Sequence, residues 1–339
     1  MSTDFSAAGP GRRAVLGWLG SAAVAGAVIP GQRAVAAPPD RALPGRAAAG
    51  RQFLAGRLRH TTVLQSFAFD EFRGHVYALQ VVAGGVRLPG ERAAVPHAVR
   101  VRRGDLCLNR LAPDGSPAGH MYLTGFGHGG SIGLEETVDG VALWTEWDAN
   151  PASGYGRGLC RFRFADGQVL SRTSPDLRTY RPLSGSTSNS PAVDPVYRRL
   201  LLRYKRRGIP RFALHDLDWF RAGVFRPLIT FAQPGARLGL PFQGMALHGS
   251  SAYQLLGSAY GTGNPPASGG NARLYRIDLR TGRVVWQQID RTAPELSPRE
   301  PEGLAVWRDG GAGTPRLCLG FTEGPAGGRT FRLYEKALN

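Results

Sequence analysis

Polar side chains recur in this sequence beside short apolar segments that have the composition of β-strands. They include amides, carboxylates, tyrosines and an arginine. Such groups suit a carbohydrate or glycerol-phosphate polymer, because hydroxyls need paired donors and acceptors, sugar rings need aromatic faces, and phosphates or uronates need a cation. The candidate ligand-binding residues are Gln65, Gln80, Glu146, Arg157, Asn189, Gln243, Tyr260, Glu300 and Glu323.

His128 is the most reactive side chain near these residues, because a histidine between glycines at a strand start is accessible and titrates near neutrality. Together with a tyrosine, such as Tyr155, and a cation it would suit β-elimination from a uronate polysaccharide. Paired carboxylates would instead suit glycoside hydrolysis. A structural role, with His128 bonded to neighbouring backbone, stays open as well. The residues predicted to act if the protein is an enzyme are His128, Tyr204, Lys205 and Glu302.

Signatures of a metal or cofactor are not recognisable in the sequence. The seven histidines include no His-x-x-x-His pair, and no calcium loop is found, although acidic residues near a shared axis could hold calcium. We therefore predict no metal site and no cofactor. Cys107, Cys160 and Cys318 lie in apolar stretches and are expected to be buried thiols, with at most one bridged pair.

A short phrase that occurs five times would position the polar residues. Each copy usually has a polar residue, then Ser or Gly, an apolar residue or Pro, Ala or Gly, and an apolar residue. The second positions are 65, 59, 54 and 59 residues apart, and such a period predicts an array of similar structural units. The copies are 65–69 (QSFAF), 130–134 (GSIGL), 189–193 (NSPAV), 243–247 (QGMAL) and 302–306 (EGLAV).

Each phrase starts a run of strand-like segments, four in the first four units and three in the last. Residues 57–64 could supply the missing outer strand. This predicts an all-β fold, a five-bladed β-propeller of four-stranded antiparallel blades closed by the N-terminal strand. An irregular pair of β-sandwiches is the alternative. The blade cores are expected at about 65–126, 130–173, 189–232, 243–290 and 302–335, with residues 169–172 ending the second blade and a short helix at 217–222.

The first strand of every blade would line the central channel. Five blades crowd that axis, which explains the small residues Ala68, Gly133, Ala192, Ala246 and Ala305. The loops between second and third strands are long and rich in Gly and Pro, so one face is elaborated and is the expected site. The alternative that these polar residues only bind water at the channel, without a ligand, stays open. The loops are 82–97, 148–158, 205–210, 261–271 and 323–328.

The first 56 residues precede the predicted propeller at 57–339. Residues 1–36 combine an Arg-Arg pair, a small apolar run and an Ala-Val-Ala cleavage pattern, which predicts a twin-arginine export signal. A membrane anchor is the alternative, but the run is short for a span. Residues 37–56 predict a flexible leader. Without the signal, 39 basic and 24 acidic residues leave a charge of +15, which favours a polyanion or reflects arginine-biased coding.

Three stretches are similar to the TagC-like β-propellers, a family that includes bacterial teichoic acid biosynthesis protein C and the propeller of phage receptor-binding tail proteins. The resemblance implies a five-bladed propeller with a link to cell-wall glycopolymers, and it assigns no catalytic residue. It covers roughly residues 57–334. The stretches are 65–70 (QSFAFD), 127–135 (GHGGSIGLE) with 143–146 (LWTE), and 243–246 (QGMA).

We therefore expect an exported propeller that binds an anionic, teichoic-acid-like cell-wall or extracellular glycopolymer at the elaborated face. One alternative is a polysaccharide lyase or glycoside hydrolase acting on a uronate-containing polysaccharide at that face. Another is a structural or protein-binding propeller. We expect a secreted monomer without membrane insertion in its mature form. Nucleic acid is not an expected partner, because no basic run exceeds three residues.

Overall fold

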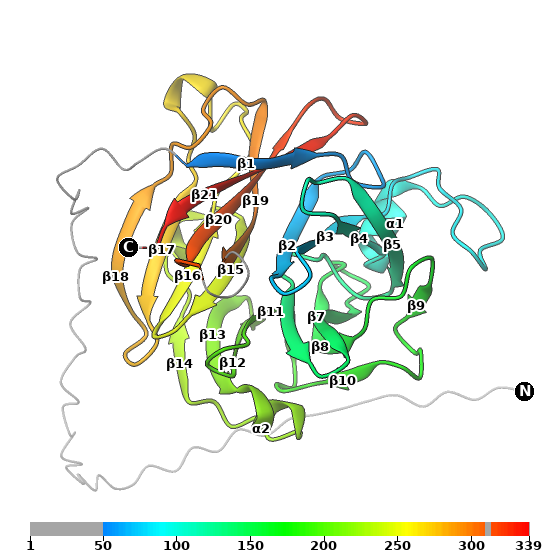
Figure 1. Ribbon diagram of the computed structural model, residues 1–339, viewed down its shortest axis with the longest axis horizontal. Coiled ribbons are helices and arrows are strands. Elements are labelled where there is room, and N and C mark those ends of the chain that lie inside the picture. The colour runs from blue at the N-terminus through cyan, green and yellow to red at the C-terminus, as the bar shows by residue number, and fades with distance from the viewer. Residues whose placement is uncertain (1–49, 309–312, 339) are drawn as a thin grey trace, which may run out of the picture. The chain divides into compact units, whose positions relative to one another are not determined.

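Five small β-sheets follow one another along the chain (Figure 1). The computed structural model describes residues 50–308 and 313–338. The predicted export signal at 1–36 and residues 37–49 of the predicted leader lie outside this range. In the described part of the chain, no helix has both the length and the apolar character that crossing a membrane requires.

Each sheet contains four neighbouring antiparallel strands, and we number the sheets as blades 1 to 5. Blade 1 holds β2 (Leu64–Asp70), β3 (His75–Val81), β4 (Leu106–Leu111) and β5 (Pro117–Thr124), with β9 (Val169–Ser171) added at its edge. Blade 2 holds β6 (Gly133–Thr137), β7 (Gly140–Ala149), β8 (Gly156–Phe162) and β10 (Arg178–Tyr180). Blade 3 holds β11 (Ser186–Asp194), β12 (Arg199–Arg206), β13 (Ile209–Asp216) and β14 (Ile229–Ala232).

The last two blades repeat the pattern. Blade 4 holds β15 (Phe242–His248), β16 (Ser251–Leu256), β17 (Arg273–Asp278) and β18 (Arg283–Ile289). Blade 5 holds β19 (Pro298–Trp307), β20 (Arg316–Glu323) and β21 (Thr330–Ala337), with β1 (Arg51–Gly56) as its outer strand. The helices of the described residues are short: α1 (His97–Arg103), α2 (Leu217–Arg221) and the 3-10 turns η1 (Ala236–Leu238) and η2 (Pro266–Ser268). The helix predicted at 217–222 is confirmed, whereas α1 was not predicted.

The blades pack against one another in a closed ring. Separate buried apolar clusters join blade 1 to 2, 2 to 3, 3 to 4, 4 to 5 and 5 to 1. The last of these places Leu54 of β1 and Cys318 of β20 with Phe67 of β2. Cys107, Cys160 and Cys318 are all buried free thiols, as predicted. The predicted all-β, five-bladed architecture is therefore confirmed.

Small residues hold the inner strands close to the axis. Ser66 Oγ donates to the Gly129 carbonyl in the next blade at 2.6 Å, and Ser131 Oγ donates to the Pro191 carbonyl at the same distance. The channel between the strands is only about 60 Å³. Its lining includes the predicted small residues Ala68, Gly133, Ala192, Ala246 and Ala305.

The strand predicted at 57–64 was placed wrongly. Residues 51–56 pair with β21 instead, so the predicted leader ends earlier and contributes a strand. The segment after β1 does not continue the strand, because its backbone amides donate to side chains instead of to a neighbouring strand. The Arg59 amide donates to Asn109 Oδ1 at 2.7 Å, and the His60 amide donates to Gln80 Oε1 at 2.9 Å.

The strand predicted to end blade 2 at residues 169–172 was also wrong. β9 lies parallel to β5 of blade 1, and β10 is the outer strand of blade 2. Asp166 explains the difference, because its Oδ1 accepts from the His120 amide on β5 at 2.7 Å and brings the chain to that edge. Leu170 is then buried in the cluster between blades 1 and 2.

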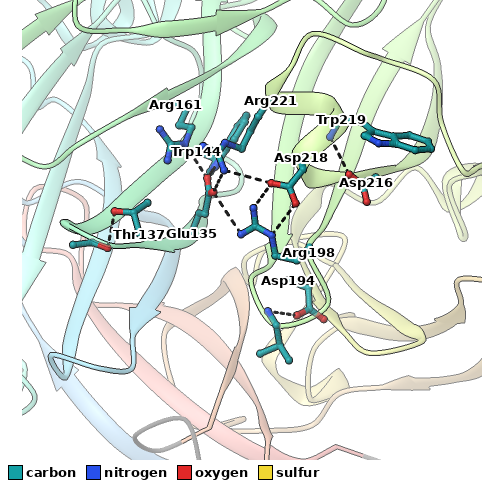
Figure 2. A network of polar contacts seen from close by, with 12 residues as sticks. Glu135, Thr137, Trp144, Arg161, Asp194, Arg198, Asp216, Asp218, Trp219 and Arg221 are labelled. Atoms are coloured by element: carbon teal, nitrogen blue, oxygen red, sulfur yellow. Dashed lines mark hydrogen bonds and ion pairs between the residues drawn. The ribbon is translucent and has the colours of Figure 1, made fainter.

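A polar network joins blades 2 and 3 around Glu135, which is 1% exposed (Figure 2). Its carboxylate accepts from Arg161 at 2.8 Å, Arg221 at 2.9 Å and the Trp144 indole at 3.2 Å, and Arg198 lies 3.7 Å away. Arg221 belongs to α2, whose N-terminus is capped by Asp216 accepting from the Trp219 amide. The short helix inserted in blade 3 therefore positions Arg221 to bind Glu135 of blade 2.

Replacing Gly303 with alanine should destabilise the ring. Gly303 has a φ of +86°, and an added Cβ would lie 2.7 Å from the Phe67 ring. Left-handed strain of about 1–3 kcal/mol and overpacking of about 1–3 kcal/mol should together lower the free energy of unfolding by about 2–6 kcal/mol in urea denaturation. The control Gly90→Ala shares the backbone strain, with a φ of +85°, but meets no atom within 4 Å. Equal losses in both variants would contradict the close approach.

Replacing Glu135 with glutamine should leave three guanidinium groups facing one another around a neutral amide. We expect the free energy of unfolding to fall by about 3–5 kcal/mol, because a buried ionic group loses its partner. Asp218→Asn is the control, since that side chain is 54% exposed and binds two of the same arginines. It should cost about 1 kcal/mol or less. Thermal and urea denaturation of both variants would show whether the buried carboxylate organises the network.

Candidate functional site

The starts of the inner strands surround a cleft of about 500 Å³ at one end of the channel. All five blades contribute to it. This is the end that carries the loops between second and third strands, so the cleft lies on the predicted elaborated face. Its polar lining residues are Gln65, His128, Tyr155, Ser188, Ser190, Arg203, Lys205, Gln233, Gln243, Glu300 and Glu302.

Six of the predicted ligand-binding and catalytic residues meet in this cleft. They come from positions up to 237 residues apart, which the closed ring brings to one mouth. The six are Gln65, His128, Lys205, Gln243, Glu300 and Glu302.

His128 lies in the wall of the cleft and packs against Tyr155, with ring centroids 4.7 Å apart. Burial lowers the pKa of His128 to about 4. Its imidazole is therefore neutral at neutral pH and a weak base. Burial also raises the pKa of Tyr155, so its hydroxyl keeps its proton as a hydrogen-bond donor.

Arg203 is a cleft residue that the sequence reading missed. It is 5% exposed, its Nε donates to Gln233 Oε1 at 2.7 Å, and its guanidinium carbon lies 4.1 Å from the centroid of the Phe242 ring. Burial lowers its pKa to about 10, which leaves it charged at neutral pH. Among the described residues, no carboxylate forms an ion pair with it.

Tyr204 does not line the cleft, because alternate residues of a strand face opposite sides. Arg203 and Lys205 on β12 face the cleft, whereas Tyr204 is buried with Trp144 and Phe220 in the cluster between blades 2 and 3. Of the four residues predicted to act in one site, Tyr204 therefore lies apart from His128, Lys205 and Glu302. Residues two apart on a strand face the same side, so the choice of Lys205 as a cleft residue also points to Arg203.

Two carboxyl groups face the cleft from β19. Glu302 is 5% exposed and makes no hydrogen bond or ion pair within the described part of the chain. Burial, followed by the charge of Glu300, raises the pKa of Glu302 well above its ordinary value. Burial also raises the pKa of Glu300, with Arg329 opposing that shift.

Glu146 organises the wall rather than facing the cleft. It is 1% exposed, and its carboxylate accepts from the amides of Gly129 at 2.6 Å, Gly130 at 3.3 Å and Gly156 at 2.6 Å. These bonds hold the glycine-rich segment that carries His128. An added Cβ at Gly127 would lie 2.3 Å from the Glu146 side chain, so a larger residue does not fit at this position.

The remaining candidates have partners outside the cleft. Gln80 binds the segment before β2, with Nε2 donating to the His60 carbonyl at 3.0 Å, and Asn189 donates to Ser186 Oγ at 3.1 Å. The other three are Arg157, which pairs with Asp148, Tyr260, whose hydroxyl donates to the Pro294 carbonyl, and Glu323, which pairs with Arg332.

A second cavity of about 530 Å³ adjoins the cleft, because both are lined by Val63, Gln65 and His128. It extends toward the loops that carry His97 and Arg329. Together the two cavities can hold more than one small chemical unit. Among the described residues, no group of three or more His, Cys, Asp or Glu is arranged to hold a metal ion.

The chain is similar to proteins of bacteria and their phages. It is 26% identical over 288 residues to "Putative major teichoic acid biosynthesis protein C" of Bacillus subtilis (strain 168), covering 82% of this chain and 60% of that protein. Its fold resembles the tail fiber of Staphylococcus aureus phage P68, with a TM-score of 0.64 and 20% identity, covering 84% of this chain and 52% of that one. The match thus spans less than two thirds of either protein's length.

The resemblance noted in the sequence is confirmed over most of the chain. A model of the phage 5-bladed β-propeller receptor-binding platform domain matches residues 63–335, which include all five inner strands and the cleft between their starts. This chain belongs to the family of phage five-bladed β-propeller receptor-binding platform domains.

Proposed function

We propose that this protein is an exported propeller that binds an anionic, teichoic-acid-like cell-wall or extracellular glycopolymer in the cleft at the channel mouth. Arg203 carries the proposal. A buried charge ordinarily forms an ion pair, and Arg203 forms none with a described carboxylate, although the charge of Glu146 acts on it from a distance. A phosphate or uronate of a bound polymer would supply the missing negative charge.

Lys205 gives the cleft a second cation. It lies two residues from Arg203 on the same face of β12, which separates the two positions by roughly 7 Å along the strand. Burial and the nearby charge of Arg203 lower the pKa of Lys205. An anion between the two side chains would relieve their repulsion, so the pair suits a phosphate better than a neutral hydroxyl.

The other lining groups suit the uncharged parts of a glycopolymer. The rings of Tyr155 and Phe242 offer flat faces to sugar or polyol carbons, and the amides of Gln65 and Gln243 offer paired donors and acceptors to hydroxyls. The adjoining cavity gives room for a neighbouring unit. The site therefore suits a segment of a chain.

The relatives support a role at the cell surface. The family description concerns receptor binding by phages, and the name of the Bacillus subtilis relative refers to teichoic acid biosynthesis. Both support the proposed binding of a bacterial surface polymer. An extracellular or wall-associated location agrees with the export signal predicted at residues 1–36.

Binding is favoured over the lyase and hydrolase alternatives by the state of two candidate groups. Glu146, the predicted partner in a carboxylate pair, is committed to three backbone amides. His128, with a pKa of about 4, is a weak base for abstracting a proton. Release of oligosaccharides, or of products with the absorbance of an unsaturated uronate, would favour catalysis instead.

Replacing both cleft cations should weaken glycopolymer binding at least about a hundredfold, because each charged hydrogen bond contributes about 1.5–3 kcal/mol. The variant is Arg203→Gln with Lys205→Gln. Arg206→Gln with Arg207→Gln is the matched control, since it removes the same charge from adjacent exposed positions. Affinity would be measured on arrays of anionic and neutral glycopolymers and by titration calorimetry, with melting temperature as a check of folding. Equal weakening in both variants would mean that the overall positive charge, and not the cleft, attracts the polymer. No binding by the wild-type protein would refute the proposed function.

A further inference from the structure

The cleft holds a buried guanidinium and a buried carboxyl group that do not pair with each other. Arg203 and Glu302 are each 5% exposed, and both line the cleft. Neither forms an ion pair with any residue that the structure describes. A folded protein usually joins such groups to a partner, because an unpaired buried charge is costly.

The two groups approach the cleft from different blades. Arg203 lies on β12 of blade 3, and Glu302 lies on β19 of blade 5. Blade 4 stands between them in the ring and contributes Gln243 to the lining. A ligand in the cleft can therefore contact a cation of blade 3 and a carboxyl of blade 5 at two separate points.

Glu302 shares the cleft with the cations Arg203 and Lys205 of blade 3, but the groups described around it from blades 2 and 5 are mostly acidic or neutral. Glu300 lies two residues earlier on the same strand, Tyr155 approaches from blade 2 beside the neutral imidazole of His128, and Arg329 acts on Glu300. No described residue pairs a cation with Glu302. A positively charged ligand group would be the first cation in contact with this carboxyl.

We propose that the cleft selects glycopolymer units that carry an ammonium group as well as an anionic group, with Arg203 and Lys205 binding the anion and Glu302 binding the ammonium. The inference rests on the proposed function and specifies its ligand class. An unacetylated amino sugar on a phosphodiester chain has this chemistry. A unit of this kind gives both buried groups a partner, whereas a purely anionic unit leaves Glu302 without one.

Binding of the ammonium has a thermodynamic signature. Burial and the charge of Glu300 raise the pKa of Glu302, so the free protein favours the protonated carboxyl more than an exposed glutamate would. Contact with an ammonium favours the carboxylate, so the proton passes to the buffer as the ligand binds. The binding enthalpy should then differ between buffers of different ionisation enthalpy, and it should not differ in this way for a ligand without the ammonium.

The test compares two glycerol-phosphate oligomers of equal length, one bearing glucosamine and the other bearing N-acetylglucosamine. Titration calorimetry with the wild-type protein should show at least about tenfold tighter binding of the free amine, equivalent to about 1.4 kcal/mol. Proton release should accompany only the free amine. Equal affinity for both oligomers without proton release would overturn this inference while leaving the proposed function standing. Binding of neither oligomer or any other anionic glycopolymer would refute the proposed function itself.

The substitution Glu302→Gln tests the contribution of this carboxyl group alone. The variant should bind both oligomers equally and release no proton. Glu295→Gln is the control, because it removes one carboxyl from an exposed position outside the cleft lining and should keep the tenfold preference. Folding is checked by melting temperature, and an isosteric amide in place of an unpaired buried acid should be tolerated. A preference that persists in Glu302→Gln would assign the ammonium to another group and overturn the inference.

Discussion

The close approach of five inner strands at one axis is the constraint on which the rest of the structure depends. Ser66 and Ser131 each donate a hydrogen bond to a carbonyl of the next blade, and an added Cβ at Gly303 would collide with Phe67. At this separation only Ser, Gly or Ala fits at the contact points. The sequence repeat reflects that requirement, because each blade must place small residues where it contacts its neighbour.

The same crowding determines where a ligand can bind. The channel itself encloses only about 60 Å³, whereas the strand starts and the loops around them leave a cleft of about 500 Å³. Polar groups gather there because the inner strands begin with them. Glu146 adds rigidity by fixing the glycine-rich segment of His128 through backbone amides. The cleft is therefore supported mainly by strands and by one buried carboxylate.

The arginine-rich composition has a different meaning once the partners are known. Arg100 pairs with Glu91 and Asp105, and Arg299 donates to backbone carbonyls of Asp290 and Thr292. These buried arginines stabilise loops and leave no charge available to a ligand. Net charge alone is thus a poor guide to binding, and the informative cations are those that face the cleft without a carboxylate, above all Arg203.

The amino-acid sequence alone predicts the five-bladed architecture and the small residues of the axis, because every blade must solve the same packing problem and so repeats the same pattern. It also predicts six residues of the cleft, since strand starts meet at a propeller mouth. Only the tertiary structure decided which polar groups are already bonded. Glu146 looks in the sequence like Glu302, but only Glu146 is bonded to backbone amides, which belong to a segment that the fold brings to it. The tertiary structure also decided that β9 joins blade 1 and that Arg203, not Tyr204, faces the cleft, because strand pairing and side-chain direction depend on contacts between distant segments.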